Sequence, residues 1–310
     1  MANHQPGKTK VALIIIYNHR YDENIEVLER IYHERFSHIY HLMPFYQGQK
    51  NNVIPIYESS YYFQGYIAQG LKHYFKEDYS HYFFIADDLL LNPIINENNY
   101  TKHLQLDSDS CFLDGFVDLH EKRFWSWTTR AVHWDMDCSS AGAEIKHQLP
   151  SYDQALRHFK KFNLSIKPIG FKQVYGPRAK KRFIRRMLKQ WAEQPKLPKT
   201  HYHLPYPMVR SYSDIVVVNA GSIEKFAHYC GVFAAGELFV ELALPTSLVL
   251  STEKIITLKN LTLKSGALWN KTDYKILQPY HYSLKKLLAQ FPANYLYLHP
   301  IKLSKWNTKL

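Results

Sequence analysis

Short apolar runs separated by polar segments dominate the first third of this 310-residue chain. Four runs have the length and the β-favouring composition of strands: residues 10–17, 37–44, 52–57 and 82–86. Two segments between them have the amphipathic pattern of helices: residues 23–36 and 59–75. The alternation predicts a mainly parallel sheet with helices on both faces, and Pro55 predicts that the third strand lies at the sheet edge.

The second half of the chain continues the α/β pattern. Further strands are expected at residues 111–119, 211–219, 254–264 and 295–298, and further helices at 221–229, 231–250 and 283–290. The expected helix 231–250 carries Glu237 and Glu241, which are four residues apart and should therefore share one face. These two acids and Pro245 interrupt the longest apolar stretch, so we expect no transmembrane helix.

All of the net charge of +12 lies in one segment. Residues 157–189 contain twelve Lys or Arg and no Asp or Glu, and the rest of the chain has 27 basic and 27 acidic residues. Within residues 180–191 the apolar positions follow one helix face, which predicts a basic amphipathic helix. Such a helix could lie on an anionic membrane surface, hold a pyrophosphate-linked acceptor, bind nucleic acid, or dock on the core with a solvated basic face.

Signals for export are missing from the pattern. The first apolar run, VALIIIY, is too short for a signal peptide and indicates a strand. The three cysteines, Cys111, Cys138 and Cys230, are scattered and form no CxxC, which favours neither a disulfide framework nor a zinc cluster. We therefore expect a reducing, cytoplasmic location, peripheral on the inner face of the membrane if the basic helix binds lipid.

Two adjacent carboxylates, Asp87 and Asp88, end the strand-like run HYFFIA. Charged groups in an apolar neighbourhood need a cation or a dense set of hydrogen bonds. Because Mg²⁺ and Mn²⁺ prefer oxygen ligands, a divalent metal site is one interpretation. The alternative interpretation is that the strand simply ends there, with Asp87 as the N-cap of a following helix.

The segment ADDLLLNP resembles the metal-binding DxD region of GT-A-type glycosyltransferases, in particular the EDD version of the N-acetylglucosaminyltransferase I family. The resemblance implies a GT-A-like, Rossmann-like doubly wound sheet, here with a basic helical insertion. It also implies Mn²⁺ or Mg²⁺ as cofactor, with Asp88 as the direct ligand and Asp87 as a helper. Ala86 stands where that family has Glu.

The same resemblance implies roles for residues in the second half of the chain. Such enzymes carry an acid-bearing helix after the acceptor strand, so Glu237 or Glu241 is expected as the catalytic base if the reaction inverts configuration. A histidine after the last strand completes the metal and pyrophosphate site in many of them, which indicates His299. Lys302, nearby in sequence, could offset charge on the leaving group.

Other candidates follow from position and residue type. Ligands of open α/β sheets lie at the carboxyl ends of strands, which places Tyr17, Asn18 and His19 near a nucleotide. A Gly-rich phosphate loop is missing after the first strand. An expected loop supplies a candidate platform for stacking an acceptor sugar: Trp125, Trp127, Arg130 and Trp134. The alternative is a structural lid over a hydrophobic patch.

These observations predict a metal-dependent glycosyltransferase with a nucleotide-sugar donor and a saccharide or lipid-linked acceptor, active in polysaccharide or glycan synthesis. We expect one domain in three parts: a donor-binding half (1–120), a Trp-rich loop with the basic insertion (121–205), and an acceptor-binding half with the C-terminal metal segment (206–310). A sugar-phosphate nucleotidyltransferase is a rival, although it would carry a Gly-rich basic loop. Two further rivals are a nucleic-acid-binding protein and an inactive scaffold. A nucleic-acid-binding function would leave Asp87 and Asp88 unexplained.

Overall fold

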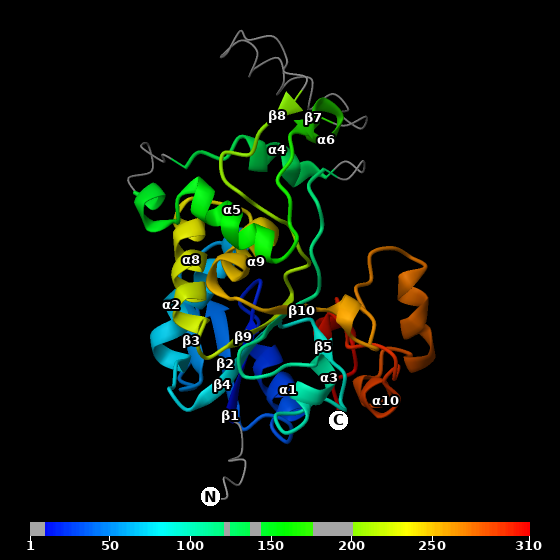
Figure 1. The fold of residues 1–310 in the computed structure, drawn as a ribbon. Helices are drawn as coiled ribbons and strands as arrows, with labels where there is room; N and C mark the ends of the chain where they lie inside the picture. The colour runs from blue at the N-terminus through cyan, green and yellow to red at the C-terminus, as the bar shows by residue number, and fades with distance from the viewer. Residues whose placement is uncertain (1–9, 121–124, 137–143, 176–200) are drawn as a thin grey trace, which may run out of the picture.

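The computed structural model describes residues 10–120, 125–136, 144–175 and 201–310. The strands of the central sheet are β1 (Lys10–Ile16), β2 (His38–Pro44), β3 (Val53–Ile56), β4 (Tyr79–Ala86), β6 (Cys111–Leu113), β9 (Ile215–Asn219) and β10 (Ile255–Thr257). Within the described ranges these form one seven-stranded sheet in the order β10-β6-β9-β4-β1-β2-β3 (Figure 1). The predicted α/β class with a mainly parallel sheet is confirmed.

The first four strands form the parallel half of the sheet. β1 pairs in parallel with β2 on one side and with β4 on the other, and its residues from Val11 to Ile16 are all buried. A continuous apolar run suits a strand that is covered on both faces, which explains why β1 lies inside the sheet. β3 lies at the sheet edge with Pro55 exposed, as the missing N–H of proline predicts.

One strand of the sheet runs against the others. β9 pairs antiparallel with both β4 and β6, whereas β6 and β10 are parallel to each other. The start of β9 therefore lies at the same edge of the sheet as the ends of β4 and β6. Two small ladders lie outside this sheet: β5 (Leu90–Leu91) pairs antiparallel with β11 (Tyr297–Leu298), and β7 (Ile169–Gly170) with β8 (His201–Tyr202).

Helices cover both faces of the sheet. Among the described residues the α-helices are α1 (Asp22–Tyr32), α2 (Gln64–Tyr74), α3 (Tyr100–Leu104), α4 (Ser126–Val132), α5 (Tyr152–Lys161), α6 (Phe171–Tyr175), α8 (Ile223–Ala235), α9 (Val240–Ser251) and α10 (Leu284–Ala289). Short 3-10 helices lie at Ser60–Tyr62, Ile145–Gln148, Leu258–Asn260, Asp273–Tyr280 and Leu303–Lys305. The tail of the chain is therefore mostly turns and short helices.

Alternate residues of β1 face two separate cores because successive side chains of a strand point to opposite faces. Leu13 belongs to the core that also contains buried residues of α1, α3 and α10, and Ile14 belongs to the core that contains buried residues of α2, α8 and α9. Figure 1 shows α2 and α8 side by side on one side of the sheet and α1, α3 and α10 on the other. A third cluster joins α5 to the outer surfaces of α8 and α9.

Several predicted boundaries are wrong. The predicted single helix 231–250 is two helices: α8 extends to Ala235, Gly236 caps it, and α9 begins only at Val240. Glu237 lies in the turn between them with a φ of 54°. The prediction that Glu237 and Glu241 share one helix face is therefore incorrect.

The strands predicted at 111–119, 211–219 and 254–264 are shorter than expected, as β6, β9 and β10 show. The segment predicted as a Trp-rich loop contains helix α4. The predicted basic helix at 180–191 lies outside the described residues. In the part of the chain that the structure describes, no helix is long and apolar enough to cross a membrane.

Candidate functional site

The candidate site lies at the carboxyl edge of the parallel strands, where the chain direction around the sheet reverses. From β1 the chain proceeds to β2 and β3 on one side, whereas β4 continues toward β9 and β6 on the other. Open α/β sheets bind their ligands at this kind of switch point. Asp87 directly follows β4 at this position, and its N–H donates to the carbonyl of Ile16 at the end of β1 (2.9 Å).

Asp87 is almost fully buried, with 3% of its surface exposed. Its Oδ2 accepts a hydrogen bond from Asn24 Nδ2 at 3.3 Å. No helix starts at this point, because the chain makes a tight turn in which Leu89 N–H donates to the carbonyl of Ala86 and then enters β5. The interpretation of Asp87 as a helix N-cap is therefore wrong.

The β5–β11 ladder brings Asp88 and His299 together. Leu90 pairs with Leu298 in antiparallel register, and the carbonyl of Asp88 accepts a hydrogen bond from Ile301 N–H at 2.7 Å. The two side chains meet beside this ladder, with His299 Nε2 2.8 Å from Asp88 Oδ1. They are 15% and 17% exposed, so the pair is largely shielded from bulk water.

Asp214 is a further acid at this edge, and the sequence analysis did not identify it. It precedes β9, and because β9 is antiparallel its start lies beside the end of β4, where Ala86 N–H donates to the Asp214 carbonyl (3.0 Å). Asp214 Oδ1 lies 3.7 Å from His299 Nε2, and the hydroxyl of Tyr212 contacts His299 Nδ1. The signal in the sequence was an acid inside the predicted strand 211–219, directly ahead of its apolar run IVVVN.

Asp114 extends the acidic edge, following β6. Its Oδ1 accepts a hydrogen bond from the hydroxyl of Tyr297 at 2.5 Å, and that hydroxyl also lies 2.7 Å from Ser265 Oγ. The rings of Tyr212 and Tyr297 stack with their centroids 5.8 Å apart and their planes 7° apart. The stacked rings therefore link His299, which Tyr212 contacts, to Asp114, which Tyr297 contacts.

The cluster contains more buried carboxyl groups than a single imidazolium can pair with. Burial, and then repulsion from Asp88, raises the pKa of Asp87 to about 7. Burial also raises the pKa of Asp214, and raises that of Asp114 to about 6. Burial alone would lower the pKa of His299, but Asp88, Asp214 and Asp87 outweigh it and raise that pKa. One imidazolium therefore offsets only part of the charge of these carboxylates.

Glu241 and Glu237 occupy different environments. Glu241 lies half-buried in the first turn of α9, where burial and then Asp214 raise its pKa to about 7, while Arg210 acts in the opposite direction. Its carbonyl accepts a hydrogen bond from Ser211 N–H at 3.0 Å, which ties α9 to the segment that carries Asp214. Glu237, by contrast, is exposed.

The tryptophans predicted to bind an acceptor pack mainly against the protein. Trp127 stacks on Phe239 with their ring centroids 3.5 Å apart, and the guanidinium of Arg130 lies 4.1 Å above the Trp127 ring. Both faces of this indole are therefore in use. Trp134 is buried and donates its Nε1–H to the carbonyl of Gly236 at 2.6 Å. Its contacts are those of a structural residue.

Trp125 is half-buried, and the guanidinium of Arg210 lies 4.6 Å above its ring. Arg210 also lowers the pKa of Glu241, so Trp125 packs against a residue that acts on the candidate site. It also makes a tilted contact with the ring of Phe239, at 6.3 Å between centroids. Trp125 therefore keeps its place as an acceptor candidate better than the other two indoles.

The predicted nucleotide-binding residues follow β1. Tyr17 is fully buried, and its hydroxyl is 2.8 Å from His41 Nδ1, so this side chain supports the strand end from within. Asn18 is half-buried and His19 is exposed, which leaves both at the surface beside the switch point. Lys302 is exposed and follows His299 by three residues.

The carboxylate oxygens and the imidazole nitrogen at this edge are ligand types that bind divalent cations. Within the described ranges, no group of three or more His, Cys, Asp or Glu side chains is arranged to hold a metal ion as it stands. Asp88 and His299 nevertheless offer a carboxylate oxygen and an imidazole nitrogen within 2.8 Å of each other, and Asp214 adds a further oxygen close by. The buried negative charge of the cluster fits a cation, and Asp87 faces Asn24 as a supporting carboxylate.

Comparison with known proteins adds no family to this geometry, since no protein-family model and no curated protein matches the chain.

Proposed function

We propose that this protein is a metal-dependent glycosyltransferase that moves a sugar from a nucleotide-diphosphate sugar to a saccharide or lipid-linked acceptor. One observation carries the proposal: a shielded Asp88–His299 pair lies at the switch point of a mainly parallel sheet, surrounded by more buried carboxylates than its imidazolium can neutralise. A divalent cation needs carboxylate ligands of this kind, and once bound it would attract the diphosphate of the donor.

Different residues would bind the cation and the nucleoside. Asp88 and His299 would hold Mn²⁺ or Mg²⁺, with Asp214 beside them and Asp87 as support. The bound cation would stabilise the negative charge that develops on the departing nucleoside diphosphate. Asn18 and His19, at the end of β1, lie at the surface where a nucleoside would be expected.

Glu241 is the better candidate for the catalytic base. A carboxylate whose pKa is raised to about 7 is a stronger base than an ordinary glutamate and is still ionised in a useful fraction near neutral pH. In an inverting reaction it would accept the proton of the acceptor hydroxyl. The electrostatic influence of Asp214 on Glu241 puts this base close to the acidic cluster, whereas Glu237 lies exposed in a turn.

A lipid-linked acceptor would place the protein at the inner face of a membrane, in the cytoplasm. This part of the proposal depends on residues 180–191, which form the predicted basic amphipathic helix.

The proposal is tested by binding and turnover of uridine and guanosine diphosphate sugars, with Mn²⁺ and with EDTA, in wild type and Asp88→Asn. Asparagine keeps the shape of the side chain and removes its charge. We expect Mn²⁺ at about 100 times its Kd to stabilise the wild type against unfolding by about 2.7 kcal/mol, and donor binding to require the metal. Asp88→Asn should lose most of both effects.

Asp109→Asn is the matched control, since Asp109 is an exposed aspartate on the loop before β6. This variant should keep the response to Mn²⁺ and the binding of donor. Donor binding that needs no metal, or a metal response of equal size in wild type and Asp88→Asn, would contradict the proposal.

A further inference from the structure

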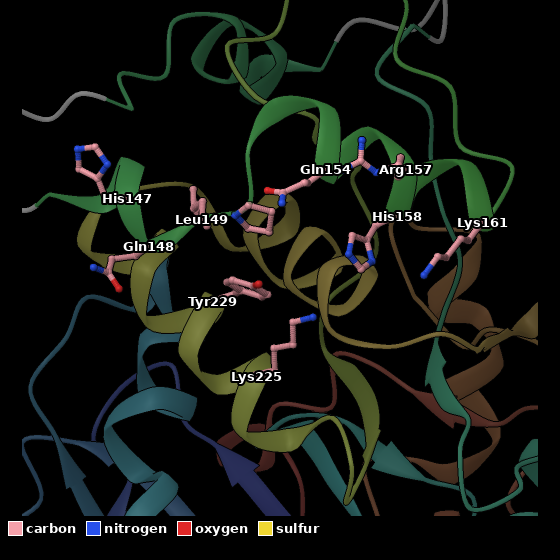
Figure 2. A pocket seen from close by; sticks show the side chains of 10 residues that line it. His147, Gln148, Leu149, Gln154, Arg157, His158, Lys161, Lys225 and Tyr229 are labelled. Carbon is pink, nitrogen blue, oxygen red and sulfur yellow. The ribbon is translucent and has the colours of Figure 1, made fainter.

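A cavity of about 670 Å³ lies between residues 147–150, helix α5 and helix α8, and none of the acids of the candidate site lines it. Basic side chains contributed by both helices line it: Arg157, His158, Lys161 and Lys225. Figure 2 shows His158 and Lys161 of α5 facing the side of α8 that carries Lys225 and Tyr229. The volume is in the range of pockets that bind small molecules.

The cavity is strongly cationic. Among the described residues that line it there is no Asp or Glu, and one of its lysines, Lys161, forms an ion pair with Glu253. Asp153 and Glu224 lie in the same two helices but do not line the cavity. Three permanently charged side chains against one paired acid leave an excess of positive charge in a concave space.

The pKa of His158 is affected by the same positive charges. Burial lowers its pKa first, and Lys161, Lys225 and Arg157 lower it further, with Glu253 acting in the opposite direction. Its Nδ1 is buried and has no hydrogen-bond partner in the described part of the chain. A buried polar atom without a partner costs free energy, and an anion that accepts a hydrogen bond from the protonated ring would offset that cost.

The walls of the cavity are fixed by hydrogen bonds that do not use its basic groups. The hydroxyl of Tyr206 donates to the carbonyl of Pro150 at 3.0 Å. Ser151 and Gln154 form a capping box at the start of α5, in which Gln154 Oε1 accepts from Ser151 N–H at 2.8 Å. This bond orients the Gln154 side chain and leaves its amide N–H₂ group as a donor at the cavity wall.

We propose that this cavity binds the phosphate or pyrophosphate group of an anionic ligand. A multiply charged, compact anion suits a concave site lined by an arginine, two lysines and a histidine, because each can make a charge-assisted hydrogen bond to a phosphate oxygen. Arg157 and Lys161 also begin the segment that holds all of the net positive charge of the chain. The inference does not depend on the metal site, since the two sites share no residue.

Calorimetric titration of the full chain with inorganic pyrophosphate tests the proposal, with EDTA present so that no metal–pyrophosphate complex contributes. We expect saturable binding in the wild type. The double variant Arg157→Ala/Lys225→Ala should weaken it at least about tenfold, because each lost charge-assisted hydrogen bond is worth a substantial part of the affinity. Lys225 Nζ lies 5.9 Å from the centre of the Tyr229 ring. This contact is weak, so removing it should leave the fold intact.

Two controls separate this site from general electrostatics and from the metal site. Lys160→Ala removes an exposed charge from α5 at a position outside the cavity and should change the affinity less than about twofold. Asp88→Asn should leave pyrophosphate binding in EDTA unchanged, so a failure of the proposed glycosyltransferase and a failure of this inference give different results. Equal weakening by Lys160→Ala and by the double variant would overturn the inference, as would binding that the double variant leaves intact.

A second arm distinguishes the source of the phosphate. The wild type is sedimented with vesicles of phosphatidylglycerol and phosphatidylcholine, with and without excess pyrophosphate, and with vesicles of phosphatidylcholine alone. Competition by pyrophosphate that the double variant abolishes would assign a lipid phosphate to the cavity. Pyrophosphate binding without any such competition would assign a soluble phosphorylated ligand. Absence of pyrophosphate binding together with tight binding of a duplex oligonucleotide would refute the inference in favour of a nucleic-acid surface.

Discussion

Replacing Glu241 by Gln should stabilise the fold at alkaline pH while strongly slowing the proposed sugar transfer. Burial and Asp214 raise the pKa of this carboxyl from 4.5 to about 7, so the folded state holds the ionised form less well than the unfolded state does. The difference between the two pKa values, at about 1.4 kcal/mol per pKa unit, corresponds to about 3 kcal/mol. Because the side chain keeps some contact with solvent, we expect a gain of about 2 kcal/mol.

The gain should depend on pH in a defined direction. Below the unfolded pKa of 4.5 the carboxyl is protonated in both states and ionisation costs nothing. As the pH rises toward 7 the unfolded state releases this proton first, and the stability associated with the protonated folded state is lost. Urea unfolding should therefore show a gain of about 2 kcal/mol for Glu241→Gln at about pH 8 and less than about 1 kcal/mol at about pH 5.

Glu237→Gln is the matched control, because the two glutamates are only four residues apart and Glu237 is exposed. Its stability should stay within about 0.5 kcal/mol of wild type at both pH values. Transfer to an acceptor should fall by about 10² to 10⁴ in Glu241→Gln and remain near wild type in Glu237→Gln. A gain that is equal at both pH values, or a loss of stability at alkaline pH, would refute the reasoning, because the carboxylate would then be well hydrated or fully paired.

Two further predictions concern the supports of the site. Arg35 donates hydrogen bonds to the carbonyls of Leu91, Asn92 and Ile95 and so fixes the chain that follows Asp87 and Asp88. Arg35→Ala should therefore reduce the free energy of unfolding by about 2 to 4 kcal/mol. A loss under about 0.5 kcal/mol in urea unfolding would contradict this role. Trp134→Phe removes the hydrogen bond to Gly236 and should lower stability by about 1 kcal/mol with an unchanged KM for acceptor; a raised KM at wild-type stability would instead support a sugar-stacking role.

The acid pair could be placed from sequence because a strand and its end are local features. The apolar run that ends at Ala86 has one stable position, inside the sheet, and the residue after a parallel strand must lie at its carboxyl edge. That reasoning requires neither the partner strands nor the helices. It correctly predicts where Asp87 lies, but it does not say which residues from other parts of the chain will meet it.

Asp214 shows why the rest of the site was missed. Its position depends on the direction of β9, and the apolar run IVVVN has the same pattern whether the strand is parallel or antiparallel. In a parallel strand Asp214 would have lain at the opposite edge, far from Asp88. Only the tertiary pairing of β9 with β4 and β6 decides the matter.

The error at Glu237 has a different origin. The length of the apolar stretch predicted one buried helix, and the residues 232–250 are apolar enough to mask the break. Gly236 is the signal that the sequence offers, since glycine commonly ends a helix where the chain must turn. Giving this glycine more weight separates Glu241 from Glu237 on sequence grounds alone.

The pairing of β5 with β11 decides when the candidate site can form during synthesis of the chain. Asp88 emerges early in synthesis, whereas its imidazole partner arrives only when most of the chain has been translated. Contacts of such long sequence separation form late in folding. A chain cut before β11 would thus leave the Asp88 carboxylate without the imidazole that lies beside it in the folded protein.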